Sequence, residues 1–189
     1  MIIGVTGLIG SGKGAVADIL VRKGFIKLGH SAILDEELRA RNIEINRDNQ
    51  VKIANEMRNQ YGHGYWARKL IERIEPGKNY VVEGFRNTAE VEEFKKIPNF
   101  LLVGVAAGRK RRYEWISNRQ RHGDPKNFEE FLKVEVRDFL EKEAYGQQNA
   151  FCFAMADRFV QNEGNLDDLN YQVNRLFEEV SETIVNTDN

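Results

Sequence analysis

The fold of this chain is decided by its first residues, MIIGVTGLIGSGKG at positions 1–14. The first six form a short apolar run, which is typical of a buried strand, and the next eight are rich in glycine. Apolar side chains then return at Val16, Ile19 and Leu20, a spacing that puts them on one face of a helix. A strand, a glycine-rich turn and an amphipathic helix in this order predict the beginning of an α/β domain.

The glycine-rich turn has the Walker A spacing of a phosphate-binding loop, with four residues between Gly7 and Gly12-Lys13. Glycines let backbone N–H groups point inward along a path that a Cβ would block, and the next helix begins there, so phosphate oxygens are favoured. Lys13 would place its charge on the β- and γ-phosphates. A turn that binds nothing is the alternative, but the strand–helix context argues against it. The expected phosphate-binding residues are Gly7, Gly10, Ser11, Gly12, Lys13, Gly14 and Ala15.

The loop departs from its common form at one position. Many such loops carry Ser or Thr after the lysine to bind Mg²⁺, whereas this chain has Gly14 and then Ala15. We therefore expect a metal ion to be held mostly by phosphates and water.

Composition restricts the class of protein. The chain has 189 residues with 41% hydrophobic residues, enough for one α/β domain over 1–189. The formal net charge of −1 provides no global field for nucleic acid or membrane, and no apolar run is long enough to span a bilayer. Cys152 is the single cysteine, which fits a reducing compartment. These features predict a soluble cytoplasmic protein.

Five short apolar runs are candidates for buried strands, with helical patterns between them. Such alternation predicts a five-stranded parallel sheet with helices on both faces, in which ligands bind beyond the carboxyl ends of the strands. Asn87 and Glu90 have the spacing of a capping box, which predicts the start of a helix. A last helix is expected after Asn165, with an apolar core-facing stripe at Leu166, Leu169, Val173, Leu176, Phe177 and Val180. The predicted strands are Ile2–Thr6, Phe25–Leu28, Tyr80–Glu83, Phe100–Ala106 and Arg158–Gln161.

The third predicted strand ends in Glu83-Gly84-Phe85-Arg86. A carboxylate at this position, beside a phosphate loop, can orient water bound to Mg²⁺. Gly84 allows a ligand to approach the backbone, and Arg86 can hold a phosphate with its two-pronged guanidinium. The alternative is a turn with a solvated salt bridge, and the neighbouring phosphate loop favours function over it.

An arginine-rich segment at 109–125 follows the fourth predicted strand. Arg112 and Arg119 are seven residues apart on one helix face, and Arg121 precedes a Gly-Asp-Pro break. Arginines that close over a transferring phosphoryl group stabilise its charge, so we interpret the segment as a lid. A solvated helix face and a nucleic-acid surface are the alternatives; acidic residues after the break argue against an extended basic surface.

A helical region at 30–75 separates the second and third predicted strands and is the expected acceptor site. Each of its arginines alone is ordinarily a surface charge, but as a group its polar residues are candidate ligands of an acceptor phosphate. They are Ser31, Asp35, Arg39, Arg47, Asn55 and Arg58, with Gly62 and Gly64.

These motifs resemble those of the P-loop nucleoside monophosphate kinase group, over nearly the whole chain. The shared features are Gly-Ser-Gly-Lys-Gly at 10–14, Glu83-Gly84-x-Arg86, and Arg112 with Arg119-x-Arg121. The chain is similar above all to the adenylate-kinase-related and dephospho-coenzyme A kinase-like proteins. The resemblance implies a P-loop kinase fold, ATP and Mg²⁺ as cofactors, and transfer of the γ-phosphoryl group to a small acceptor. It also places Asn162-x-Gly164, after the last strand, near the adenine.

Two departures from the family pattern concern catalysis. Relatives often have Ser-Asp after the second strand, where this chain has Ser31-Ala32, and the strand-end Asp is here Glu83. Glu83 or Asp35 would have to compensate. The segment 145–149 also looks like part of this subgroup, and its amides either read a base or cap a helix end.

The leading interpretation is an ATP-dependent kinase acting on a nucleoside monophosphate or a similar small nucleotide. The alternatives are transfer to a hydroxyl acceptor such as dephospho-coenzyme A, and a nucleotide-binding regulatory module with weak activity. Neither a membrane nor a nucleic-acid partner is expected. The catalytic candidates are Lys13, Arg112, Arg119 and Arg121; the acceptor candidates are Ser31, Arg58, Gly84, Arg86 and Gln148; Glu83 is expected to hold the metal through water.

Overall fold

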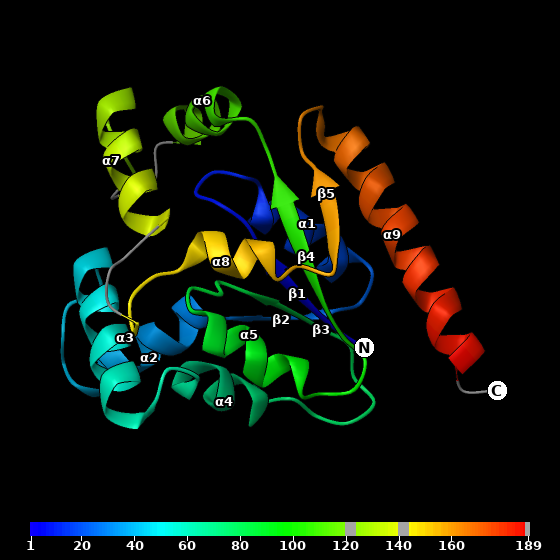
Figure 1. Ribbon diagram of the computed structural model, residues 1–189, viewed down its shortest axis with the longest axis horizontal. Helices are drawn as coiled ribbons and strands as arrows, with labels where there is room; N and C mark the ends of the chain where they lie inside the picture. Colours follow the sequence, from blue (N-terminus) through cyan, green and yellow to red (C-terminus); the bar gives the residue numbers. More distant parts are fainter. Residues whose placement is uncertain (120–123, 140–143, 188–189) are drawn as a thin grey trace.

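The computed structural model describes residues 1–119, 124–139 and 144–187, and its elements alternate between strand and helix (Figure 1). The strands are β1 (Ile2–Thr6), β2 (Ile26–Gly29), β3 (Tyr80–Glu83), β4 (Phe100–Ala106) and β5 (Arg158–Gln161). The helices are α1 (Lys13–Arg22), α2 (His30–Ala40), α3 (Arg47–Tyr61), α4 (Tyr65–Ile71), α5 (Thr88–Lys95), α6 (Arg109–Arg119), α7 (Phe128–Phe139), α8 (Asn149–Ala154) and α9 (Leu166–Thr187).

The strands form one sheet in the order β2-β3-β1-β4-β5, and every pairing is parallel. The predicted parallel sheet is therefore confirmed, and four of its strands have the predicted bounds. The second strand is shifted by one residue. The N–H of Phe25 donates to the carbonyl of Leu20 at the end of α1, so ladder pairing begins only at Ile26, whose N–H donates to Asn79.

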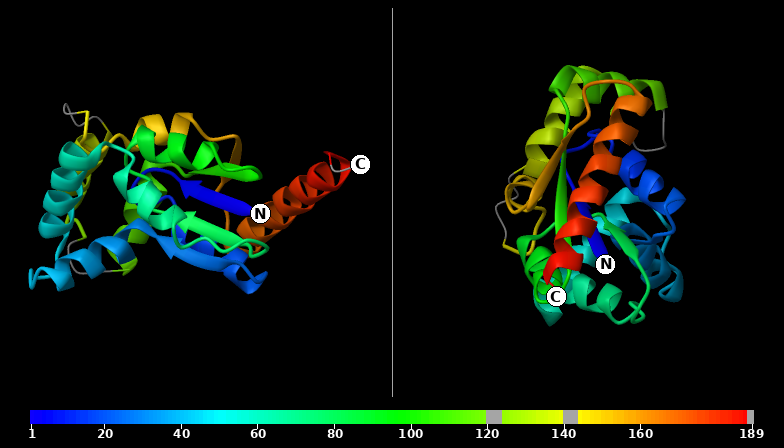
Figure 2. Two further views of the ribbon diagram at one scale, coloured as in Figure 1. Left: turned by 90° about the horizontal axis from the view of Figure 1, so that it is seen from below. Right: turned by 90° about the vertical axis from the view of Figure 1, so that its right-hand side faces the viewer.

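Alternate residues of the strands enter two separate cores, one on each face of the sheet. Ile3, Val5 and Val81 pack with α1 and α9 on one face. Ile2 and Val82 pack on the other, in a core that α2, α3, α4, α5 and α8 complete. Figure 2 shows α9 on one side of the sheet and α5 with α8 on the other. Both faces are covered, as parallel sheets require.

The helices α6 and α7 lie beyond the carboxyl ends of the strands (Figure 1). They share a small apolar cluster with the glycine-rich loop, formed by Ile9, Ile116 and Phe131. A Cβ on Gly10 would lie 2.8 Å from the carbonyl oxygen of Arg112. The arginine-rich helix is thus packed directly on the loop that precedes α1.

Two sequence expectations about helix ends have different outcomes. Asn87 and Glu90 form the predicted capping box of α5. The predicted core-facing stripe of α9 is wrong at its first residue. Leu166 is 56% exposed, whereas Leu169 and Val173 are buried. Leu166 is the first residue of α9 and follows Asn165. Within the described residues, no helix is both long and apolar enough to cross a membrane.

Candidate functional site

The loop between β1 and α1 has the backbone shape that its glycines predict. Gly7, Gly10 and Gly12 have φ of 152°, 76° and 92°, values that L side chains rarely adopt. A Cβ on Gly7 would lie 2.5 Å from the carbonyl oxygen of Val105. The Lys13 ammonium folds back over the loop and donates to the carbonyls of Gly7 and Leu8, each at 2.8 Å. The loop is therefore a cradle at a helix N-terminus, and its residues fit the phosphates of a nucleotide.

Asn162 supports this loop from the end of β5. Its side-chain Nδ2 donates to the carbonyl of Ser11 at 3.0 Å, and the side chain is buried. A Cβ on Gly12 would meet that same nitrogen at 2.1 Å, so glycine is required there for packing as well as for φ. Gly164 lies two residues further on, against the carboxylate of Asp168. The structure thus joins the predicted adenine-side segment to the phosphate loop.

The ends of β2, β3 and β1 lie in register beside the loop. Gly29 pairs with Glu83, and Glu83 pairs with Val5, so three strand ends open on one region. The Glu83 carboxylate lies 3.1 Å from the ammonium of Lys27 on β2. Burial lowers the pKa of Lys27, but the charges of Glu83 and Asp18 outweigh it and raise the pKa above the ordinary value. In this structure Glu83 is a residue at the end of β3 that forms an ion pair.

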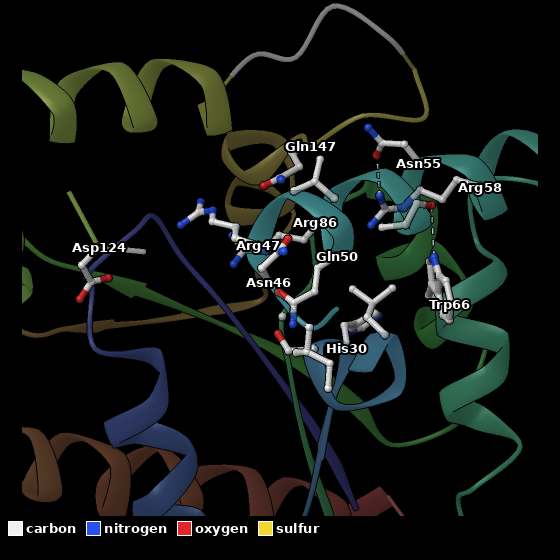
Figure 3. A pocket seen from close by; sticks show the side chains of 16 residues that line it. His30, Asn46, Arg47, Gln50, Asn55, Arg58, Trp66, Arg86, Asp124 and Gln147 are labelled. Carbon is white, nitrogen blue, oxygen red and sulfur yellow. Dashed lines mark hydrogen bonds between the residues drawn. The ribbon is translucent and has the colours of Figure 1, made fainter. Parts of the chain in front are cut away.

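A pocket of about 340 Å³ lies beyond these strand ends, with α2 and α3 on its sides (Figure 3). Its lining includes three arginines, four side-chain amides and one acidic residue. Some of the acceptor residues predicted from sequence line it, namely Ser31, Arg47, Asn55, Arg58, Gly84 and Arg86. The others, Asp35, Arg39, Gly62, Gly64 and Gln148, are not among its lining residues. The lining residues are His30, Ser31, Leu34, Ile45, Asn46, Arg47, Gln50, Val51, Ala54, Asn55, Arg58, Trp66, Gly84, Arg86, Asp124 and Gln147.

Arg58 is the most buried arginine of the pocket wall, with 3% of the residue exposed. Its Nη2 and Nε donate to Oε1 of Glu90 at 2.7 and 3.0 Å. Its Nη1 donates to Asn55 Oδ1 at 3.2 Å (Figure 3). A carboxylate inside the protein therefore already pairs with this predicted acceptor ligand.

The segment 145–149 is attached to the turn that carries Arg86. The N–H of Gln148 donates to the carbonyl of Arg86 at 2.6 Å, and its side-chain oxygen accepts from both the N–H and the hydroxyl of Thr88. In this structure Gln148 therefore caps the first turn of α5, which is one of the two roles expected from the sequence. The amide that faces the pocket is that of its neighbour, Gln147.

The predicted lid arginines hold different partners. Arg112 is 4% exposed, and its guanidinium donates to the carbonyls of Ile9 and Ala107 and to the carboxylate of Glu135 on α7. Arg119 forms a two-pronged pair with Asp124, at 2.7 and 2.8 Å. Arg121 lies outside the described residues. Arg112 thus braces the phosphate loop against α6 and α7, a role that its position in the sequence did not reveal.

His30, at the start of α2, links the pocket to the strand ends. Its Nδ1 lies 3.0 Å from the carbonyl oxygen of Glu83, which can only accept, so Nδ1 carries the proton of the neutral ring. Nε2 is 3.7 Å from Oε2 of Glu90. Burial lowers the pKa of His30, aided by Arg58 and Arg86, although Glu90 opposes the shift.

The lowered pKa of His30 predicts a loss of stability in mild acid. The unfolded chain takes up a proton near the ordinary pKa of about 6.5, whereas the folded chain resists protonation. The free energy of unfolding should therefore fall as the pH drops from about 6.5 towards 5. Urea denaturation at several pH values will measure this slope. It should be shallower in His30→Gln than in the wild type, and equal slopes would show that His30 is not the titrating group.

Among the described residues, no group of three or more His, Cys, Asp or Glu side chains is arranged to hold a metal ion. A magnesium ion that accompanies a nucleotide would therefore depend on phosphate oxygens and water, with Glu83 as the carboxylate at the strand end nearest the loop. This donor set suits Mg²⁺, which keeps several of its waters.

The parallel sheet, the phosphate loop and the strand-end pocket define a P-loop kinase fold. Residues 3–137 match the AAA domain family AAA_18, and the chain belongs to that family and to the UPF0200 proteins. A UPF0200 protein of Aeropyrum pernix is 34% identical over 93% of this chain and 91% of its own length. A shikimate kinase of Bacteroides thetaiotaomicron has a TM-score of 0.63 at 13% identity, covering 96% and 98% of the two chains. A gluconokinase of Sinorhizobium meliloti has a TM-score of 0.61 at 14% identity, covering 99% and 97%.

Proposed function

We propose that the protein is an ATP-dependent phosphotransferase whose acceptor is a nucleoside monophosphate or a similar small nucleotide. The observation that carries this proposal is the register of the strand ends. Val5, which leads into the phosphate loop, pairs with Glu83, which leads into the pocket wall. A donor nucleotide on the loop and an acceptor in the pocket would therefore meet at neighbouring positions of one sheet edge.

The pocket lining favours an acceptor that carries a phosphate. Arg47, Arg58 and Arg86 bring three guanidinium groups to it, of which that of Arg58 is paired with Glu90. Its side-chain amides offer both donors and acceptors to a base. Among the described lining residues, Asp124 is the only acid, and Arg119 already pairs with it. A hydroxyl acceptor needs a general base, whereas a phosphate acceptor is already ionised, so Ala32 in place of Asp matters less for the latter.

Chemistry at such a site requires positioning and charge stabilisation from the protein. The loop N–H groups and Lys13 would hold the β- and γ-phosphates. Arg58 and Arg86, with Arg47 beside them in the pocket lining, would orient the acceptor phosphate. Arg119, at the exposed end of α6, would leave Asp124 and turn towards the transferring group. Glu83 would hold magnesium through water, and the ion would supply positive charge to the phosphates of the donor.

Coupled ADP release tests this proposal. The purified protein is assayed with ATP and Mg²⁺ over a panel of nucleoside monophosphates, nucleosides and dephospho-coenzyme A. We expect turnover that depends on a nucleoside monophosphate. Turnover only with a hydroxyl compound would refute the acceptor class, and ATP binding without turnover on any acceptor would favour a regulatory module.

Glu83→Gln tests the proposed link to the metal. The amide keeps the shape of the side chain but removes the charge that would orient metal-bound water, so Mg²⁺-dependent turnover should fall by about 10–100-fold. ATP binding without metal should stay unchanged, because the loop and Lys13 are untouched. Lys27→Met is the matched control for the ion pair. If Lys27→Met alone reproduces the loss, the pair rather than the metal contact matters.

A further inference from the structure

One buried carboxylate lies behind the acceptor pocket. Glu90 on α5 has 0% of its surface exposed, and it accepts four hydrogen bonds. Oε1 accepts from Nε and Nη2 of Arg58, and Oε2 accepts from the backbone N–H groups of Arg86 and Asn87 at 2.9 and 3.2 Å. Every one of these four partners is a donor, so only an ionised carboxylate fits. Burial opposes ionisation, but the charge of Arg58 and the hydrogen bonds from Arg58 and the Arg86 N–H lower the pKa of Glu90 below its ordinary value.

The two oxygens of Glu90 hold residues from two different elements of the pocket wall. Arg58 comes from α3, on the acceptor side, and Arg86 comes from the turn after β3. Both backbone polar groups of Arg86 are hydrogen-bonded. Its N–H donates to Oε2 of Glu90, and its carbonyl accepts from the N–H of Gln148. From the sequence, Glu90 was identifiable only as a capping-box residue. The second partner, Arg58, is 32 positions away along the chain.

We propose that Glu90 is a positioning residue of the acceptor site, which sets Arg58 and the Arg86 turn at the distance that an acceptor phosphate requires. The proposal rests on the function proposed above. In this proposal the carboxylate of Glu90 fixes the position of Arg58 relative to the turn that carries Arg86. Glu90 would act through these arginines and would not contact the acceptor itself.

A purely structural role would not require this arrangement. Replacing a buried ion pair by a neutral pair of similar volume is often tolerated by the fold. The Glu90 carboxylate, however, orients two residues that line the pocket. A positioning role and a purely stabilising role of Glu90 can therefore be told apart in a fully folded variant. The measurement that separates them is the affinity of that variant for an acceptor.

The primary variant is Glu90→Gln, and its matched control is Glu93→Gln. Glu93 lies on the same helix and also pairs with an arginine, Arg68, at 3.0 Å, but at the surface. In Glu90→Gln the side-chain NH₂ would face hydrogen-bond donors, either the Arg58 guanidinium or the N–H groups of Arg86 and Asn87. AMP and, separately, ATP are titrated by calorimetry into each protein at a temperature where all are folded.

We expect Glu90→Gln to raise the Kd for AMP by roughly 10- to 100-fold, because small misplacements of positioning groups have effects of this size. The Kd for ATP should change by less than about twofold, since the phosphate loop is untouched. Glu93→Gln should leave both constants at their wild-type values. An unchanged Kd for AMP in Glu90→Gln would overturn the positioning role. Absence of binding of every nucleoside monophosphate in the wild type would instead refute the proposed acceptor class, which keeps the two failures distinct.

A double variant, Arg58→Gln with Glu90→Gln, covers the case in which the single variant does not fold. It replaces the buried charges by two amides that can hydrogen-bond to each other, while the amide oxygen at position 90 still accepts from the Arg86 turn. We expect a folded protein that binds ATP normally and AMP at least about 10-fold more weakly than the wild type. Wild-type AMP affinity in this folded double variant would show that the pair serves only stability.

Discussion

Lys13→Ala should reduce ATP-dependent phosphoryl transfer by about 10²- to 10³-fold while the fold survives, because it removes a charge that stabilises the transferring group. The Lys13 ammonium lies over the loop, where it donates to the carbonyls of Gly7 and Leu8, and the side chain is half-buried. Its loss therefore opens no core cavity. Coupled ADP release measures the rate, and circular dichroism with thermal melting measures the fold.

Lys69→Ala is the control for the loss of a lysine. Lys69 lies on α4, exposed, and pairs with Glu72 three residues further along the chain. It should retain wild-type turnover. Equal ATP-dependent turnover in Lys13→Ala and the wild type would refute the assignment of this loop as the donor site.

Glu90→Ala should lower the free energy of unfolding by about 3–5 kcal/mol, which is the cost of breaking a buried ion pair by removing one partner. The substitution leaves the Arg58 guanidinium buried without its carboxylate. It also removes the acceptor of the Arg86 and Asn87 N–H groups. Urea denaturation at neutral pH measures the change.

Glu93→Ala is the comparison for this stability experiment. Its pairs with Arg68 and Lys96 lie at the surface, where ion pairs contribute about 0–1 kcal/mol. A similar, small loss in both variants would mean that water reaches the Glu90 cluster in solution. The buried charge network would then not be a feature of the folded state.

The sheet and the phosphate loop were predictable because their signals are local. Each strand is a short apolar run, and the glycine spacing of the loop follows from backbone geometry that only glycine adopts freely. The strand bounds agree except at β2, where a single hydrogen bond from Phe25 to α1 moves the start. Local patterns could also locate the capping box of α5.

The pairing inside the site was not predictable, because it joins distant parts of the chain. Arg58 and Glu90 are 32 residues apart, and Arg112 and Glu135 are 23 apart. A sequence shows that these arginines are suited to phosphate, but not that an internal carboxylate faces each of them. Likewise, neighbouring glutamines could not be told apart until the backbone placed Gln147 towards the pocket and Gln148 on Thr88.

Mapping of the two ligands by NMR tests the central claim, that donor and acceptor occupy adjoining sites at one edge of the sheet. A non-hydrolysable ATP analogue with Mg²⁺, and then AMP, are added to the ¹⁵N-labelled protein. The analogue should shift the amide signals of Gly10, Gly12 and Lys13, and AMP should then shift those of Arg86 and Gln147. Shifts from AMP only at the phosphate loop, displaced by the analogue, would contradict a separate acceptor site.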